Sequence, residues 1–544
     1  MRSTMPDFPL TLRHFLWRAT TIFPRKEIVT RRENGVHRYT YQDFGARAAQ
    51  LAHALGQLGV EPGDRVATFA WNNARHLELY FAVPCAGAVL HTLNLRLFPE
   101  HLEFIIKDAE DKVIFVDASA LPALERVAGK MPTVRQYVCM CDGPVPPSPL
   151  QPMVSYEELL SGLPSSYPWP ELDERDAASM CYTSGTTGKP KGVVYSHRST
   201  FLHTLGTWAQ ADIGVGEADC VMPVVPMFHA NAWGMPYVAT MAGAKQVFTD
   251  RFLDPKSLAD LIRQEQVTWT AGVPTIWIGL LNYLEQTDTA LPSLRHIGCG
   301  GSAAPLGLIE GLDRRGLKIF HAWGMTETSP VATFGSIKSY LRKGTPADLQ
   351  LKAKQGITAP GVEVRLCDVE TGEAVPWDGK TPGEIQVRGP WVTAAYYHGA
   401  DPEKFTPDGW LRTGDVANID SEGYIQIVDR TKDMLKSGGE WISSVELESE
   451  IMAHPKVLEA AVIGIPHPKW QERPLAYVVP KPAFKGQLTA EEILEHLRER
   501  VAKWWLPDEV RFIDEVPKTS VGKFDKKVLR EQASRQPARV TPSE

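Results

Sequence analysis

The sequence predicts a multi-subdomain α/β protein with a large N-terminal domain and a small, mobile α+β C-terminal domain. Between residues 44 and 321, helix-like and strand-like patterns alternate along the chain. This alternation is typical of largely parallel sheets covered by helices. After about residue 360, short strand patterns separated by Gly, Pro and Asp take over. We therefore predict two α/β subdomains and a β-rich subdomain within the N-terminal domain.

The α/β subdomains are predicted from apolar spacing. Phe44, Ala48, Leu51, Leu55 and Leu58 recur at steps of four and three, which places them on one face of a helix. A turn at 59–64 and a buried strand at 65–70 follow. A later region repeats the alternation, with helices predicted at 258–263, 275–284 and 306–315 and strands at 267–271, 296–299 and 318–321.

The β-rich subdomain is predicted from three short strands, at 362–366, 383–388 and 424–428. The polar segment 429–436 comes next and is followed by Gly438 and Gly439, which is typical of a hinge between domains. We accordingly divide the chain into an N-terminal domain, the hinge and a C-terminal lid domain, at residues 1–428, 429–436 and 437–544.

The last hundred residues are expected to form a compact α+β unit. Ser443 with Glu446, and Thr489 with Glu492, have the spacing of capping boxes that begin helices. Strands are predicted at 457–465 and 475–479. Lys518, Lys523, Lys526, Lys527 and Arg530 form a basic segment, in which an isolated lysine would usually be a solvated surface charge. The polar tail beyond Arg530 is expected to be frayed.

The composition excludes several classes of protein. With 43% hydrophobic and 23% charged residues, the chain has enough apolar material to fold around a core. Seven cysteines without metal-type spacing argue against a disulfide scaffold and for a reducing compartment. The excess of 65 acidic over 58 basic residues argues against nucleic acid as the main partner.

Targeting and membrane signals are not evident in the sequence. The N-terminal residues break their apolar run with charges, so no signal peptide is expected. The most apolar stretch, 221–244, contains prolines and a histidine, so no transmembrane segment is expected either. The last residues carry no peroxisomal or retention tag. We expect a cytoplasmic protein, for which peripheral membrane contact stays open.

The segment 182–192 carries the strongest chemical signal. It contains four Ser or Thr residues, three glycines and two lysines. Glycines let backbone N–H groups approach an anion closely, and hydroxyl and ammonium groups add donors, so a polyphosphate is the expected ligand. A solvated loop is the plain alternative. The segment 182–192 is not a Walker A loop. In that loop the two glycines are five positions apart and Lys is followed by Ser or Thr, whereas here Gly185 and Gly188 are three positions apart and Pro190 follows Lys189.

A second glycine-rich segment, 298–303, matches the G-x-G-x-x-A pattern of dinucleotide-binding folds. Pro305 follows it, and no acidic ribose partner stands at the expected distance. We interpret it as a glycine turn lining a pocket, where backbone must lie close to a ligand.

Five segments, in order, resemble the motifs of the adenylate-forming enzymes, which include acyl-CoA synthetases, peptide-synthetase adenylation domains and luciferases. They are the segments 182–192, 321–329, 409–415, 429–436 and 517–524. The resemblance extends from about residue 12 to residue 532. Three further segments are most similar to bacterial medium- and long-chain fatty acyl-CoA ligases, namely 223–233, 300–304 and 437–448. Ligases for 3-methylmercaptopropionate share several of them.

The resemblance implies a nucleotide site. Thr183 and Glu327 would hold Mg²⁺, Asp415 would bind the ribose, and Lys523 would be the catalytic lysine of adenylation, together with Glu327 and His229 as catalytic residues. The full set implied for ATP or AMP is Thr183, Ser184, Gly185, Thr186, Thr187, Gly188, Lys189, Lys191, Gly301, Ser302, His321, Ala322, Trp323, Gly324, Met325, Thr326, Glu327, Asp415, Ile427, Arg430 and Lys523.

The resemblance also implies where the other two substrates bind. The carboxylic acid would lie against His229, Trp233, Val273, Gly300, Gly301, Trp323 and Met325. Coenzyme A would approach near Lys436, Gly438 and Gly439, and Trp441 would act as a gate.

The implied activity is an ATP-dependent carboxylic acid–CoA ligase for a medium- to long-chain fatty acid. The acid and ATP would give an acyl-AMP and pyrophosphate, and CoA would then give the acyl-CoA and AMP, without a redox cofactor. Alternatives are a ligase for a short or thioether acid such as 3-methylmercaptopropionate, an adenylating enzyme with another acceptor, and a nucleotide-binding regulator without catalysis. Similar ligases imply a homodimer with the N-terminal region in its interface.

Overall fold

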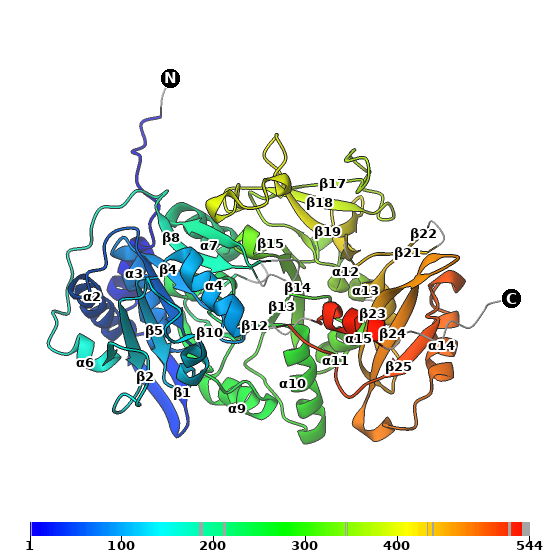
Figure 1. The fold of residues 1–544 in the computed structure, drawn as a ribbon, viewed down its shortest axis with the longest axis horizontal. Helices are drawn as coiled ribbons and strands as arrows, with labels where there is room; N and C mark the ends of the chain where they lie inside the picture. The colour runs from blue at the N-terminus through cyan, green and yellow to red at the C-terminus, as the bar shows by residue number, and fades with distance from the viewer. Residues whose placement is uncertain are drawn as a thin grey trace.

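The computed structural model describes residues 1, 3–183, 189–209, 214–342, 344, 346–431, 433–437, 440–519 and 524–535. For Trp208, Pro346, Ala347, Lys436, Glu440 and Trp441 it describes the backbone alone. Figure 1 shows one large body made by the blue-to-yellow part of the chain and a smaller orange-to-red unit at its side. Within the described residues the strands form four sheets.

The first α/β subdomain is built on a seven-stranded sheet of order β7-β6-β5-β3-β4-β8-β9 in the described chain. All its pairs are parallel except β8 with β9. Its strands are β3 (Arg65–Phe69), β4 (Val89–Thr92), β5 (Val113–Asp117), β6 (Gln136–Met140), β7 (Met153–Ser155), β8 (Ala177–Tyr182) and β9 (Gly192–Ser196). Its helices are α2 (Tyr41–Gln57), α3 (Ala74–Cys85), α4 (Pro99–Ala109), α5 (Leu121–Leu124), α6 (Tyr156–Leu160) and α7 (His197–Trp208).

The second α/β subdomain is built on a nine-stranded sheet of order β16-β15-β14-β13-β12-β10-β11-β1-β2 among the described strands. Its centre, from β1 to β14, is parallel. Its strands are β1 (Glu27–Arg32), β2 (Gly35–Thr40), β10 (Cys220–Pro223), β11 (Lys245–Phe248), β12 (Trp269–Gly272), β13 (His296–Cys299), β14 (Lys318–Gly324), β15 (Val331–Phe334) and β16 (Ile357–Thr358). Its helices are α1 (Arg13–Ile22), α8 (Met235–Ala242), α9 (Pro255–Glu265), α10 (Pro274–Thr287), α11 (Leu306–Arg314) and α12 (Pro346–Ala353).

An antiparallel sheet of order β17-β18-β19-β20 forms the β-rich subdomain. Its strands are β17 (Glu363–Cys367), β18 (Gly383–Arg388), β19 (Leu411–Ile419) and β20 (Ile425–Arg430). The first two residues of the predicted hinge, Asp429 and Arg430, therefore belong to β20, and the last two, Leu435 and Lys436, begin the next strand. Lys432 lies outside the described residues.

The C-terminal unit packs helices on a sheet of order β22-β21-β24-β23, with β25 on β24. The strands are β21 (Leu435–Ser437), β22 (Glu440–Ile442), β23 (Val457–His467), β24 (Gln471–Pro480) and β25 (Glu509–Phe512), and the helices are α13 (Ser444–Met452), α14 (Ala490–Arg498) and α15 (Lys526–Arg535). The Ser443 hydroxyl accepts a hydrogen bond from the Glu446 N–H, and the Thr489 hydroxyl accepts one from Glu492, as the capping signals predict. Helix α15 continues to Arg535, beyond Arg530, where a frayed tail was expected.

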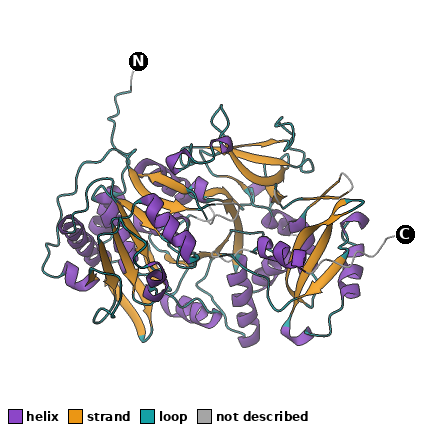
Figure 2. Ribbon diagram, in the orientation of Figure 1, coloured by secondary structure: helices purple, strands orange, loops and turns teal. Residues whose placement is uncertain are grey.

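Burial explains why the apolar patterns predicted these elements. Phe44, Ala48, Leu51 and Leu55 are fully buried on one side of α2, whose first turn is closed by a capping box between Thr40 and Asp43. Strands β12 and β13 are buried on both faces, since helices cover the sheet on either side (Figure 2). The predicted alternation of helices and strands therefore corresponds to a sheet with layers of helices on both of its faces.

A buried polar cluster joins the C-terminal unit to the body. The Asp429 carboxylate at the end of β20 accepts hydrogen bonds from the Ser444 N–H at 2.7 Å and its hydroxyl at 2.5 Å. Lys526 on α15 donates to the Ser444 hydroxyl at 2.5 Å and pairs with Glu448 at 2.8 Å. Burial lowers the pKa of Lys526, but the carboxylates of Glu448 and Asp429 raise it above its usual value. One ammonium thus neutralises two buried carboxylates from different domains.

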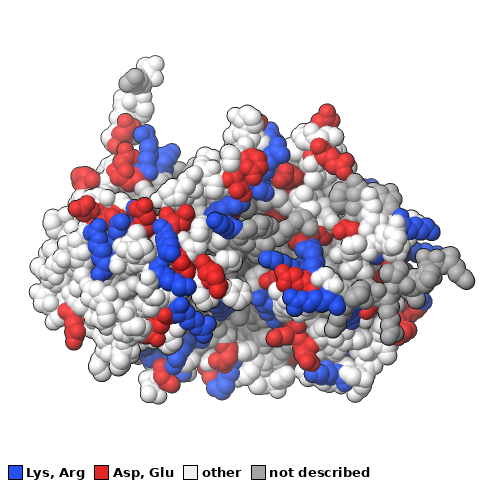
Figure 3. Space-filling view, in the orientation of Figure 1, with Lys and Arg blue, Asp and Glu red and all other residues white. Residues whose placement is uncertain are grey.

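The charges of the surface and the lengths of the helices bear on contact with nucleic acid and with membranes. In Figure 3, acidic and basic side chains are interspersed over the face shown, and no large area of it carries one sign. Among the described residues, no helix is long and apolar enough to cross a membrane.

Replacing Lys526 with Met should weaken the C-terminal unit, because Glu448 and Asp429 would stay buried without a cation. Breaking a buried ion pair from one side usually lowers the free energy of unfolding by about 3 to 5 kcal/mol. The measurement is the midpoint of urea unfolding, monitored by hydrogen exchange of the β23 and β24 amides. The matched control is Lys527→Met on the exposed neighbouring side chain. Equal midpoints for the two variants would contradict the role of the cluster.

Candidate active site

Two adjoining cavities open where the central parallel strands of the nine-stranded sheet end. The first has a volume of about 440 Å³ and lies between the ends of β13 and β14, the β8–β9 connection and β19. The second, of about 350 Å³, continues it toward α13 and α15 of the C-terminal unit. They share Gly301, Ala322, Trp323, Gly324, Asp415 and Arg430. Ligands of open α/β sheets commonly bind at this end of the strands.

Strand β14 and the turn after it form the shared wall. A Cβ built on Gly324 would lie 1.8 Å from the Pro330 carbonyl oxygen, so only glycine fits there. The turn places Glu327 on the first cavity with 5% of its surface exposed. Burial raises the pKa of Glu327, while the Tyr396 hydroxyl, which donates to its Oε1 at 2.5 Å, lowers it. The Glu327 carboxylate is therefore held in a fixed position facing the cavity.

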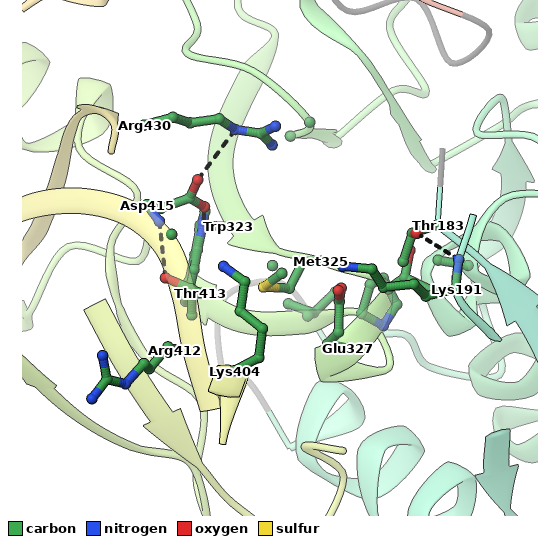
Figure 4. A pocket seen from close by; sticks show the side chains of 18 of the residues that line it. Thr183, Lys191, Trp323, Met325, Glu327, Lys404, Arg412, Thr413, Asp415 and Arg430 are labelled. Atoms are coloured by element: carbon green, nitrogen blue, oxygen red, sulfur yellow. Dashed lines mark hydrogen bonds and ion pairs between the residues drawn. The ribbon is translucent and has the colours of Figure 1, made fainter. Parts of the chain in front are cut away.

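Asp415 lies on β19 directly across the cavity from β14. Its Oδ2 accepts a hydrogen bond from the Trp323 indole N–H at 2.8 Å, and its Oδ1 is 3.3 Å from Arg430 Nε (Figure 4). The Asp415 N–H donates to the Thr413 hydroxyl at 3.1 Å. Trp323 and Arg430 thus orient the carboxylate at the cavity wall, and Thr413 holds the backbone that carries it; the remaining lone pairs of the carboxylate can accept from ligand hydroxyl groups.

The edges of the Gly- and Thr-rich loop lie at the opposite end of the first cavity. The Thr183 N–H donates to the Lys191 carbonyl oxygen at 2.9 Å, and the Lys191 N–H donates to the Thr183 hydroxyl at 3.2 Å. The Lys191 ammonium pairs with Asp401, and burial lowers its pKa, with a further contribution from the positive charge of Lys404. Lys189 lies over the Phe104 ring at 5.5 Å. This end of the cavity is suited to phosphate groups.

The wall of the second cavity contains the other predicted nucleotide residues. His321 is buried, and its ring nitrogens lie 3.1 Å from the carbonyl oxygens of Ala353 and Ser302. Burial lowers the pKa of His321. The Ile427 N–H donates to Gln355 Oε1 at 2.5 Å. His321, Ser302 and Ile427 all line this cavity together with Trp323 and Gly324.

Most residues predicted for the carboxylic acid line the first cavity, namely His229, Trp233, Gly300, Gly301, Trp323 and Met325. A Cβ on Gly300 would lie 3.1 Å from the Trp233 ring, so the glycine lets this ring pack closely. Val273 is the residue before α10, and the next two residues, Pro274 and Thr275, line the second cavity. A contact between Val273 and the acid stays a prediction.

A narrow apolar cavity extends behind Trp233. Its volume is about 40 Å³, and it shares Trp233, Ala322 and Val331 with the first cavity. The rest of its wall is formed by Thr207, Val215, Val221, Met235, Val238, Trp269, Ala271, Gly298, Phe320 and Phe334. A polar cleft and an apolar cavity therefore meet at Trp233.

Some predicted site residues cannot be placed. Ser184, Gly185, Thr186, Thr187, Gly188, Gly438, Gly439 and Lys523 lie outside the described residues, and only the backbones of Lys436 and Trp441 are described. These two residues are paired between β21 and β22.

The sequence did not indicate six other residues of the first cavity that carry polar or charged side chains, namely Tyr396, Asp401, Lys404, Arg412, Thr413 and Thr431. Arg412 and Thr413 belong to the motif at 409–415, and Thr431 to the one at 429–436, so these two motifs could have indicated them. Tyr396, Asp401 and Lys404 lie in the β18–β19 connection, which carries no recognisable motif.

Comparison with known proteins identifies the family. The profile of the AMP-binding enzyme family matches residues 16–397, and that of the AMP-binding enzyme C-terminal domain matches residues 446–523. The chain belongs to the AMP-binding enzyme family. The predicted family is thereby confirmed, and the two matched regions agree with a large N-terminal and a small C-terminal part.

Among relatives of this AMP-binding enzyme, the long-chain-fatty-acid–CoA ligase of Thermus thermophilus is 51% identical, over 97% of both chains. The 3-methylmercaptopropionyl-CoA ligase of Ruegeria lacuscaerulensis is 44% identical, over 98% of this chain and 99% of its own. The crystal structure of the anthranilate CoA ligase AuaEII with anthranoyl-AMP has a TM-score of 0.87 and 26% identity, over 97% and 99% of the two chains. The predicted fold class is confirmed.

Replacing Trp323 with Phe should weaken AMP binding to this AMP-binding enzyme by about fivefold to tenfold. The indole N–H would no longer orient Asp415, and a hydrogen bond to a charged group contributes roughly 1.5 to 3 kcal/mol, part of which Arg430 would retain. Isothermal titration with AMP measures the change. Trp391→Phe is the control, since its buried indole donates to the Val331 carbonyl oxygen outside the described cavities. Unaltered affinity in Trp323→Phe, or an equal loss in both variants, would refute this role.

Proposed function

We propose that this protein is an AMP-forming ligase that joins a medium- to long-chain fatty acid to coenzyme A. The observation that carries the proposal is the meeting of a polar cleft, fitted for a nucleotide, with an apolar cavity at Trp233. An acid whose tail lies in the apolar cavity has its carboxylate beside the phosphate end of the cleft.

The chemistry follows from the poor leaving group of a carboxylate. A carboxylate oxygen attacks the α-phosphorus of ATP, the bond from that phosphorus to the bridging oxygen of the β-phosphate breaks, and pyrophosphate leaves with the electron pair. The CoA sulfur then attacks the acyl carbon, AMP leaves, and the thiol proton is released. Such transfers depend mainly on positioning and charge stabilisation.

Each part of the cleft has a role in this proposal. Asp415 accepts from the ribose hydroxyls, the segment 321–324 borders the adenine, and Lys189 and Lys191 face the phosphates with the loop 184–188. His229 lies at the carboxylate end of the acid. Lys523 supplies the ammonium that bridges the acid and the α-phosphate, where two anions meet and charge develops.

Thr183 and Glu327 are the residues that would hold Mg²⁺. Both offer oxygen atoms to the same cavity, and Tyr396 occupies only one carboxylate oxygen of Glu327 among the described contacts. Mg²⁺ prefers oxygen ligands and uses one or two protein carboxylates together with phosphates and water. It would neutralise charge on the phosphates. Among the described residues, no group of three or more His, Cys, Asp or Glu side chains forms a dedicated metal cage.

We also propose that the C-terminal domain, residues 437–544, rotates about the hinge 429–436 on the N-terminal domain, residues 1–428. The rotation would bring Lys523 to the cleft for adenylation and the CoA-facing segment at Lys436, Gly438 and Gly439 for thioester formation. Trp441 would gate the acid's path. The second cavity, between the two domains, is the space through which this exchange would occur.

We further propose a cytoplasmic homodimer. The compartment is supported by the buried, unpaired state of all seven cysteines. Trp17, which is 57% exposed, and Ile22, which is 50% exposed, lie on α1 near Phe8 and support an interface at the N-terminal region.

A ligase for a shorter or thioether acid is the second candidate. The apolar cavity, of about 40 Å³, is much smaller than the first cavity, of about 440 Å³. A long acyl tail would therefore need its walls to move. The relative named for 3-methylmercaptopropionyl-CoA supports the same candidate, whereas an adenylating enzyme with another acceptor has no comparable support.

Mixing the protein with ATP, CoA and octanoate should yield octanoyl-CoA and AMP in equal amounts. Lys523→Ala should reduce octanoyl-AMP formation by about 100-fold or more, because the bridging ammonium is lost. It should leave thioester formation from pre-made octanoyl-AMP within about threefold of the unaltered enzyme. Lys256→Ala, on an exposed lysine of α9, is the control. Equal loss of both steps in Lys523→Ala, or no AMP from the unaltered protein, would oppose the proposal.

Enlarging the apolar cavity by Trp269→Val should shift the enzyme toward longer acids. One methylene in an apolar pocket contributes about 1 to 3 kcal/mol to specificity, so the palmitate-to-octanoate ratio of kcat/KM should rise at least about fivefold. The assay is a panel from propionate and methylmercaptopropionate to palmitate. Leu280→Val, a buried change on α10 away from the described cavities, is the control. An unaltered ratio would exclude this cavity as the acyl site.

A further inference from the structure

Lys404 has a firmly held backbone in the connection between β18 and β19. It ends a short 3-10 helix, Pro402–Lys404. Its N–H donates to the Asp401 carbonyl oxygen at 3.0 Å, and the next N–H, of Phe405, donates to Pro402 at 3.1 Å. The Phe405 ring packs edge-on against Tyr396, with ring centres 5.6 Å apart. The Lys404 side chain therefore extends from a backbone whose position is fixed.

The side chain of Lys404 is directed into the first cavity. Figure 4 shows its ammonium between the strand that carries Thr413 and Asp415 and the turn that carries Glu327. A Cβ built on Gly414 would lie 3.4 Å from Lys404 Nζ, so the absence of a side chain there leaves room for the ammonium. The ammonium thus lies between the Asp415 end and the Thr183–Lys191 end of the cleft.

Among the described residues, Lys404 forms no ion pair, because the acidic side chains of the cavity have other partners. Asp401 pairs with Lys191, Asp415 with Arg430, and the Tyr396 hydroxyl donates to Glu327. The lining contains five basic and three acidic side chains, so an anionic ligand is needed to balance it. A lysine on an open surface would have its ammonium in bulk water, whereas this half-buried one faces the cavity.

We propose that Lys404 is a further nucleotide-binding residue, whose ammonium contacts the triphosphate of ATP between the ribose end at Asp415 and the phosphate end at Lys191. The inference rests on the proposed function. An ammonium on a flexible stem offers three donors and a compact charge, which suit successive phosphate oxygens. Lys404 would therefore bind ATP more strongly than AMP and would stabilise the charge on departing pyrophosphate.

The test compares binding of Mg-ATP and AMP to the full-length protein by isothermal titration. Lys404→Met should bind ATP about tenfold more weakly, the size expected for one charge-assisted hydrogen bond in a half-buried site. Its affinity for AMP should change less than about twofold. Lys404→Arg should retain ATP affinity within about threefold. Lys256→Met, on an exposed lysine of α9, is the control and should change neither affinity.

Kinetics separate binding from a structural role. In Lys404→Met the KM for ATP should rise about tenfold, while the KM for the acid and thioester formation from pre-made acyl-AMP stay unaltered. Lys404→Gln serves as a second neutral variant if Lys404→Met has a lower melting temperature. ATP binding as tight as in the unaltered protein, or equal loss of ATP and AMP affinity, would overturn the inference.

The outcomes also separate this inference from the proposed function. If the unaltered protein binds ATP but forms no acyl-AMP with any acid, the proposed function fails, and the ratio of ATP to AMP affinity still tests Lys404. If the unaltered protein forms acyl-CoA and Lys404→Met matches it at limiting ATP, the inference alone fails.

Discussion

In the proposed reaction two anions meet in this cleft, and their repulsion is the constraint on which the rest of the structure depends. Two unit charges 4 Å apart repel each other by about 4 kcal/mol at the effective dielectric constant of a partly buried site. The whole chain has a net charge of −7, yet the cavity wall has more basic than acidic side chains. Cationic groups are therefore concentrated where a carboxylate approaches a triphosphate, and the overall charge says little about this site.

Strand β14 and its turn provide one rigid wall for several functions. Trp323 lines both the first and the second cavity while its N–H holds Asp415, Gly324 brings backbone to the same shared wall, and Glu327 follows in the turn after β14. The C-terminal unit closes the second cavity from the other side, docked by the cluster of Asp429, Ser444 and Lys526. The residues proposed to bind the nucleotide and the acid, and those that contact the C-terminal unit, thus lie on or next to the strands β14, β19 and β20.

Much of the fold was predictable, because apolar spacing reports burial. The helix facing inward through Phe44 and Leu51 and the strand 296–299 lie where the pattern placed them. Motifs also gave the positions of Asp415 and Glu327. Contacts between distant segments were not predictable. Lys526 belongs to a basic segment where a lysine was expected to be a solvated surface charge, yet α13 and β20 bury it with Glu448 and Asp429. Lys404 and Tyr396 enter the site through a loop whose course only the tertiary structure determines.

The most direct test of the account is the fate of the acid's oxygen atoms. Octanoate labelled with ¹⁸O in both carboxylate positions is converted with ATP and CoA, and the products are analysed by mass spectrometry. Attack of the carboxylate on the α-phosphorus predicts one ¹⁸O in each AMP released and none in pyrophosphate. Unlabelled AMP, or ¹⁸O in pyrophosphate or inorganic phosphate, would contradict an acyl-adenylate formed in this cleft.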